Sequence, residues 1–123
     1  MTSQDYLIEL TFTPFASLPT PPEVITFIER LALPTLEGLE RLAASGRILA
    51  GGSVLAAGGF VFIARVGSPQ ELEDLVSSLP LAARAETRVV PLGSFASRAA
   101  TIRARLDRAR AALAEDALRP AAA

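Results

Sequence analysis

The sequence predicts an α+β fold in which an antiparallel sheet of four strands carries helices on one face. Two β-like runs, Arg47 to Ala56 and Gly59 to Val66, are joined by a glycine turn at Ala57-Gly58-Gly59. A helix with a capped start at Ser68 and a strand from Glu86 to Leu92 follow, with few residues between elements. One strand and one helix precede this block, so the predicted order is βαββαβ, the ferredoxin-like arrangement.

The first strand is predicted from residue 6 to residue 12 by its alternating polarity. Apolar side chains at Tyr6, Ile8, Leu10 and Phe12 share one face, and Glu9 points to the other. Several prolines follow and make the linker to the next element stiff and non-helical. We therefore expect the apolar face of this strand to join the core.

The first helix is predicted from Pro22 or Glu23 to about Ser45, because apolar residues recur at helical spacing. Pro34 lacks a backbone donor and crowds the preceding turn, so we expect either a kink or a second helix that starts near this residue. Gly46 is expected to close the helix as a C-cap. The apolar positions are Val24, Phe27, Ile28, Leu31, Leu36, Leu39 and Leu42.

The uncovered face of the sheet is predicted to be half apolar and half charged. In the second strand, Ile48 and Ala50 are expected on the helix-covered face, with Leu49 on the other. A mixed face of this kind is unfavourable in water for a single copy, so we expect two sheets to pair face to face as a dimeric α+β barrel that encloses a cavity. The residues expected on the uncovered face are Glu9, Thr11, Arg47, Arg65, Glu86 and Arg88.

Two later helices have clear start signals. Ser68-Pro69-Gln70-Glu71 is a capping box with proline at the first helical position, and the helix must end near Leu79-Pro80. Ser94 is the expected N-cap of a helix to about Leu118, whose apolar residues follow heptad-like steps. We expect this helix to pack on a neighbouring subunit or to brace the domain. Its seam comprises Phe95, Ala99, Ile102, Leu106, Ala109 and Leu113.

The chain is therefore predicted to contain one ferredoxin-like domain at residues 1–93, a helical extension at 94–119 and a disordered tail at 120–123. With 12 basic and 13 acidic residues the net charge is −1, which favours neither nucleic acid nor an anionic membrane as partner. The absence of cysteine and histidine removes thiolate chemistry and the commonest metal ligand. We expect no metal, no cofactor, no membrane span and a cytoplasmic location.

Glu9 is the strongest candidate for chemistry, because a carboxylate in mid-strand on the presumed cavity face can transfer protons. The alternative is that Glu9 forms an ion pair with an arginine of an adjacent strand and simply fills the barrel.

Five segments carry a resemblance to a known family: Leu36 to Arg47, Gly59 to Val66, Ser68 to Leu72, Ser78 to Leu81 and Val89 to Leu92. Together they resemble the muconolactone delta-isomerase family, and the best marker is the helix that ends in Ser-Leu-Pro-Leu before the last strand. The resemblance implies oligomers built from dimeric barrels. It also implies a double-bond shift in a small carboxylate-bearing lactone, without metal or organic cofactor.

Two functions follow from these observations. In the first, the protein is an isomerase or lyase of a small organic acid, Glu9 is the acid/base, and Arg47, Arg65 and Arg88 bind the substrate carboxylate. In the second, it is a non-catalytic homo-oligomeric domain that binds a small ligand or drives assembly, and the same residues form a structural charge network. A cavity of about 300 Å³ or more converging on Glu9 would favour the first function. A barrel filled with paired glutamate and arginine would favour the second.

Overall fold

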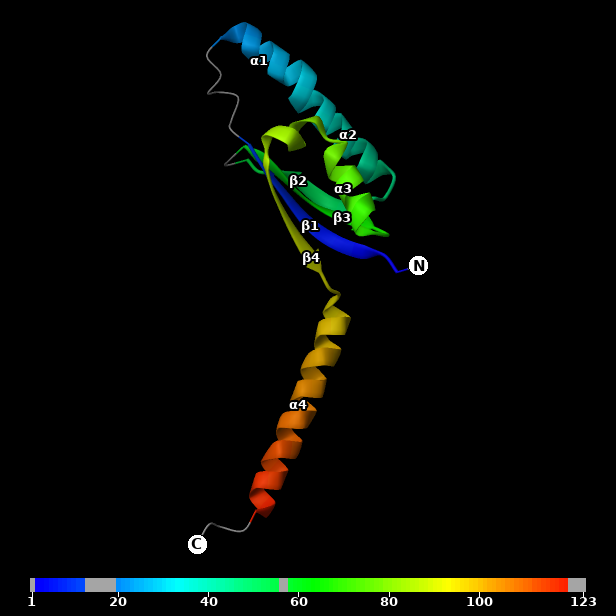
Figure 1. Ribbon diagram of the computed structural model, residues 1–123, viewed down its shortest axis with the longest axis vertical. Coiled ribbons are helices and arrows are strands. Elements are labelled where there is room, and N and C mark those ends of the chain that lie inside the picture. The colour runs from blue at the N-terminus through cyan, green and yellow to red at the C-terminus, as the bar shows by residue number, and fades with distance from the viewer. Residues whose placement is uncertain (1, 13–19, 56–57, 120–123) are drawn as a thin grey trace. The chain divides into compact units, whose positions relative to one another are not determined.

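The computed structural model describes residues 2–12, 20–55 and 58–119 (Figure 1). The chain divides into two compact units, Met1–Leu92 and Gly93–Ala123. The predicted turn residue Ala57 and the predicted tail at residues 120–123 lie outside the described residues. The elements are β1 (Gln4–Thr11), α1 (Pro21–Phe27), the π-helical segment η2 (Ile28–Ala32), α2 (Leu33–Ala44), β2 (Ile48–Ser53), β3 (Gly59–Val66), α3 (Pro69–Ser77), the 3-10 helix η3 (Pro80–Arg84), β4 (Glu86–Leu92) and α4 (Phe95–Leu118).

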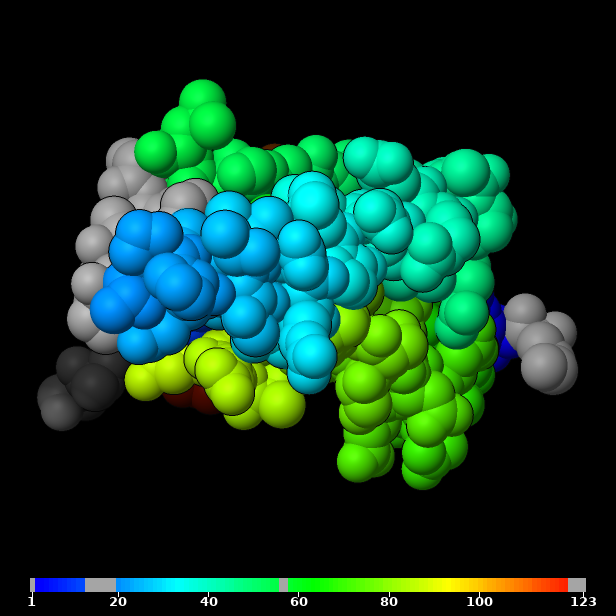
Figure 2. All heavy atoms as spheres, turned by 90° about the horizontal axis from the view of Figure 1, so that it is seen from above, coloured from blue at the N-terminus to red at the C-terminus, as the bar shows by residue number. Residues whose placement is uncertain are grey.

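The first unit has the ferredoxin-like fold that the sequence predicts. Its four strands form one antiparallel sheet in the order β2-β3-β1-β4, so β1 and β3 are central and β2 and β4 are the edges. The helices lie on one face of the sheet (Figure 1). In Figure 2 the band formed by α1 and α2, coloured blue to cyan, lies beside η3 and α3, coloured yellow-green to green.

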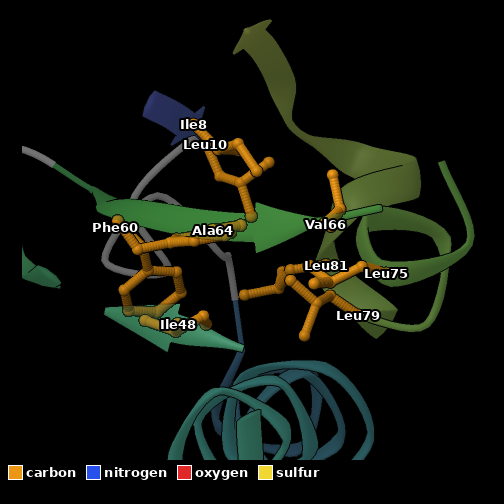
Figure 3. Close-up of a cluster of buried hydrophobic side chains, with 10 residues drawn as sticks. Ile8, Leu10, Ile48, Phe60, Ala64, Val66, Leu75, Leu79 and Leu81 are labelled. Carbon is orange, nitrogen blue, oxygen red and sulfur yellow. The ribbon is translucent and has the colours of Figure 1, made fainter. Parts of the chain in front are cut away.

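The core lies between the sheet and these helices (Figure 3). Ile8 and Leu10 of β1 are fully buried, and alternate residues of β3 are buried opposite them, which confirms the predicted alternation of both strands. The ring of Phe12 extends the core, with its centroid 6.4 Å from that of Phe27 and 5.6 Å from that of Phe60. The buried apolar residues are Ile8, Leu10, Ile48, Phe60, Phe62, Ala64, Val66, Leu75, Leu79 and Leu81.

Pro34 divides the first helical stretch as predicted. The five residues before α2 form the π-helical segment η2, and Pro34 then occupies the first turn of α2, where its missing N–H is tolerated. The wider turn of η2 accommodates the proline ring, which would otherwise crowd the carbonyl group one turn earlier. Gly46 follows α2 with a φ of +81°, the left-handed conformation that ends many helices.

The structure corrects the predicted orientation of Ala50. A bulge between Ile48 and Ala50 shifts the register, so that Ile48 pairs with Ala64 but Ala50 pairs with Ile63. Because Ile63 lies on the uncovered face, Ala50 also lies there, and Gly51 takes the position on the covered face.

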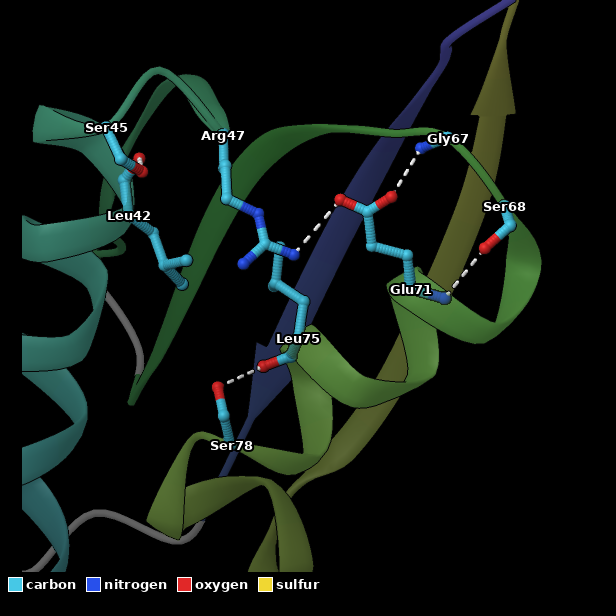
Figure 4. A network of polar contacts seen from close by, with 8 residues as sticks. All are labelled: Leu42, Ser45, Arg47, Gly67, Ser68, Glu71, Leu75 and Ser78. Carbon is cyan, nitrogen blue, oxygen red and sulfur yellow. Dashed lines mark hydrogen bonds and ion pairs between the residues drawn. The ribbon is translucent and has the colours of Figure 1, made fainter. Parts of the chain in front are cut away.

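The capping box of α3 forms with one change from the expected geometry (Figure 4). The Oγ atom of Ser68 accepts a hydrogen bond from the backbone N–H of Glu71 at 3.1 Å. The carboxylate of Glu71 accepts from the N–H of Gly67 at 2.8 Å, one residue before the usual partner. Both interactions fix the entry of the chain into α3.

Thr35 links α2 to the segment that precedes β4. Its side chain is fully buried, and its Oγ1 atom accepts a hydrogen bond from the backbone N–H of Leu81 at 3.0 Å. Leu81 is also fully buried, so water cannot replace this acceptor.

We expect Thr35→Val to lower the free energy of unfolding by about 1–3 kcal/mol, because it leaves the N–H of Leu81 buried without an acceptor. Urea unfolding followed by circular dichroism measures the change. Thr35→Ser retains the hydroxyl group and should be the less destabilised variant. Equal losses in both variants would show that this hydrogen bond is not the cause.

Candidate functional site

The uncovered face of the sheet carries an apolar centre with one ion pair on each side of it. Leu7 lies opposite Ile63 on one side and Val90 on the other, and all three side chains are half-buried. Asp5 stands in the row before this centre, and Glu9 stands in the row after it. We refer to Leu7, Ile63 and Val90 as the central row.

Glu9 and Arg88 are brought together as the sequence suggests. They are direct partners in the register of β1 and β4, with Oε2 of Glu9 3.7 Å from Nη1 of Arg88. The Glu9 side chain is 34% exposed and the Arg88 side chain 72% exposed. This contact is longer than a hydrogen bond, so it holds the arginine loosely.

Arg65 lies on the same face but away from Glu9. It stands opposite Asp5, which it binds through two parallel hydrogen bonds, Nε to Oδ1 at 2.8 Å and Nη2 to Oδ2 at 3.1 Å. Asp5 and Glu9 are four residues apart in one strand, which corresponds to about 13 Å. Sequence reasoning missed Asp5, although it has the same parity as Glu9 and could have been found from that alternation.

The two hydrogen bonds between Asp5 and Arg65 shift both groups toward their charged forms. The Arg65 guanidinium lowers the pKa of Asp5 below its ordinary value, first through the hydrogen bonds and then through its charge. The Asp5 carboxylate raises the pKa of Arg65 for the same reasons. This is therefore the better-formed ion pair of the uncovered face.

The expected position of Arg47 on the uncovered face is corrected. Its Nη2 atom lies 3.2 Å from Oε1 of Glu71 in the first turn of α3, on the side of the sheet that the helices cover (Figure 4). Arg47 immediately precedes β2, and Glu71 is held in place by Gly67, so the guanidinium reaches a fixed carboxylate there. Of the three candidate arginines, all in the part of the chain that the structure describes, Arg88 alone lies beside Glu9.

Within the residues that the structure describes, two hollows are found near the edge strand β2. The smaller, about 250 Å³, is lined by Glu9 and by mostly apolar neighbours that include Val54, Phe60 and Val61. The larger, about 360 Å³, lies between α2 and β2 and was not predicted from the sequence.

We call the larger hollow the α2–β2 groove. Leu36, Leu39, Glu40 and Ala43 of α2 form one wall, and residues 48–53 of β2 with Phe60 to Phe62 of β3 form the other. Gly51 has a φ of +155°, and a Cβ atom there would lie 2.5 Å from Cβ of Phe62, so glycine is required. The adjacent pair Gly51-Gly52 was the only signal in the sequence that could have indicated this groove.

Comparison with known proteins shows no family for this chain. No protein-family model matches the chain, and no curated protein matches it. Within residues 2–12, 20–55 and 58–119, no three histidine, cysteine, aspartate or glutamate side chains are grouped so that they could hold a metal ion. None of the helices described is both long enough and apolar enough to cross a membrane.

The lowered pKa of Asp5 predicts a pH dependence of stability. A depressed pKa in the folded state adds stability above the ordinary value of 3.8, and this stability is lost as the pH falls through the lower folded value. We therefore expect Asp5→Asn to be less stable than the wild type at pH 7. The difference should shrink progressively below pH 3.8, as urea unfolding at a series of pH values measures. A constant difference across this range would contradict the assignment.

Proposed function

We propose that residues 1–92 form a non-catalytic assembly domain that pairs with a second copy through the uncovered face of its sheet. The observation that carries the proposal is the central row, in which Leu7, Ile63 and Val90 form a continuous apolar strip across three strands. A strip of this kind is stabilised when another apolar surface covers it.

The ion pairs on either side of the central row support the same proposal. Asp5 binds Arg65 and Glu9 contacts Arg88 within one copy, so neither carboxylate requires a new partner when the face is covered. Charges that enter an interface already paired are less unfavourable to bury than isolated ones. Two identical faces related by a two-fold axis would place the central rows of both copies together, about 10 Å apart.

The positions of the candidate arginines also favour assembly over catalysis. Each of Arg47, Arg65 and Arg88 already contacts a carboxylate of the chain. To bind a substrate carboxylate, each guanidinium must first break its contact with the carboxylate of the chain. Of the three arginines, only Arg88 is held loosely enough for this to be easy.

The assembly proposal predicts that Leu7→Arg reduces the molecular mass by a factor of about two, because it places a charge without a partner in the middle of the paired faces. Light scattering measures the mass, and circular dichroism shows that the fold is kept. Leu55→Arg is the matched control, since Leu55 is 97% exposed in the β2–β3 connection. A folded Leu7→Arg protein with the mass of the wild type would overturn the proposal.

A second candidate function is proton transfer by Glu9, in line with the resemblance to muconolactone isomerases. It is favoured by one observation: Glu9 lines a hollow with apolar neighbours, and Arg88 beside it retains donors that can bind an anion. In this function Glu9 moves the proton of a small carboxylate-bearing lactone, and Arg88 binds its carboxylate.

For this second function we expect Glu9→Gln to lower the turnover of lactone isomerisation by about 10²- to 10⁴-fold, since the amide cannot exchange a proton. A panel of small carboxylate-bearing lactones, followed by absorbance, provides the assay. Glu86→Gln is the control, because Glu86 is an exposed carboxylate on the same face that does not line the hollow. Equal turnover in wild type and Glu9→Gln would remove Glu9 from the mechanism.

A further inference from the structure

Helix α4 carries an apolar seam that its own unit does not bury. It contains 24 residues, which corresponds to a length of about 36 Å. Along the seam, Phe95 is 96% exposed and Leu113 70% exposed, and Ile102 and Leu106 are exposed as well. These residues, with Ala99 and Ala109, follow steps of four and three, which is the pattern of a helix that packs against a partner along one narrow stripe.

Arginines border this seam on both sides. Five of the positions next to the seam are arginine: Arg98, Arg103, Arg105, Arg110 and Arg119. The other three, residues 96, 112 and 117, are alanine. None of these bordering positions carries a carboxylate. Two α4 helices packed along their seams would therefore form no ion pair between arginine and carboxylate beside the seam. In a parallel pair of α4 helices, Arg98 would face Arg103, and Arg105 would face Arg110, which is unfavourable. The seam therefore requires a partner with acidic borders.

The two units of the chain carry opposite net charges. Residues 93–123 contain six arginines and three carboxylates, a net charge of +3, whereas residues 1–92 contain six arginines and ten carboxylates, a net charge of −4. Three of those ten carboxylates form the ion pairs described above. The remaining acidic groups of the first unit are concentrated on the helices before β2, where Glu23, Glu29, Glu37 and Glu40 lie.

The α2–β2 groove combines an apolar floor with part of this acidic charge. Glu40 lines the groove and Glu37 precedes it by one turn; within the described part of the chain, neither carboxylate has an ion-pair or hydrogen-bond partner. Ala43 and Gly51-Gly52 on the two walls are small, so the backbone of a helix can approach closely. Leu36 and Leu49 are exposed and available for contact with an apolar seam.

We propose that α4 of one copy docks in the α2–β2 groove of a second copy, with its bordering arginines against Glu37 and Glu40. Each copy supplies one helix and one groove, so the exchange can be reciprocal and closes as a two-fold pair. The apolar seam contributes the burial, and the opposite charges select the groove over another α4.

Charge reversal on each side tests the proposal. The groove variant carries Glu37→Arg and Glu40→Arg, and the helix variant carries Arg98→Glu, Arg103→Glu, Arg105→Glu and Arg110→Glu. Both are made in the Leu7→Arg background, so that pairing of sheet faces does not contribute and the two proposals fail separately. With both contacts, the wild type is expected to have a four-copy mass. In the Leu7→Arg background we expect light scattering to give a two-copy mass when α4 and the groove are unchanged, and a one-copy mass for either reversal variant alone. A mixture of the two reversal variants should again give a two-copy mass.

The mixture is the decisive sample, because the acidic helix of one variant meets the basic groove of the other. A one-copy mass of the unreversed protein, or masses that neither reversal changes, would overturn the proposal. Binding of the unreversed protein to anionic vesicles would also overturn the proposal, if only the helix variant lost this binding and the masses did not change. The partner of the apolar seam would then be a membrane surface.

Cysteine cross-linking decides which copy supplies the helix. The chain contains no cysteine, so Leu36→Cys in one preparation and Leu106→Cys in another carry one thiol each. On mixing and mild oxidation, we expect a disulfide between the groove of one copy and the helix of the other. Leu36→Cys with Arg108→Cys is the control, since Arg108 lies on the other side of α4 from Leu106. A disulfide that forms only within one chain of the Leu36→Cys/Leu106→Cys double variant would overturn the exchange between copies.

Discussion

The in-register pairing of β1 with both of its neighbours is the constraint on which the first unit depends. Because β1 is paired on both sides, its alternation fixes which residues of β3 and β4 face the helices and which do not. Ile8 and Leu10 enter the core for this reason, and Leu7 and Glu9 are presented on the other face. The core and the candidate interface are thus two results of a single register, and a shift by one residue would exchange them.

The uncovered face and the α2–β2 groove differ in the way they use charge. On the uncovered face, arginine and carboxylate neutralise each other within one copy, and the central row remains available for an apolar partner. At the groove, Glu37 and Glu40 have no ion-pair partner in the part of the chain that the structure describes, and their proposed partners are the arginines of α4 from a second copy. The first arrangement favours association of identical faces, and the second favours association of unlike surfaces.

Much of the fold could be predicted because its signals are local. The bounds of β3 and β4, the cap at Ser68 and the break at Pro34 each depend on a few neighbouring residues. The site was harder, because its contacts depend on tertiary structure. The glycine pair Gly51-Gly52 indicates a bulge in this strand but not which residue changes face. The pairing of Arg47 with Glu71 depends on where α3 begins relative to β2. The α2–β2 groove likewise exists only once a helix packs beside a strand.

The chemistry of the ion pairs determines how the charged contacts respond to solution conditions. Each one described joins a carboxylate to an arginine, and the chain contains neither histidine nor lysine. Dissolved salt screens exposed charges over about 8–10 Å. Contacts that depend on the arginines of α4 would therefore weaken as the ionic strength rises.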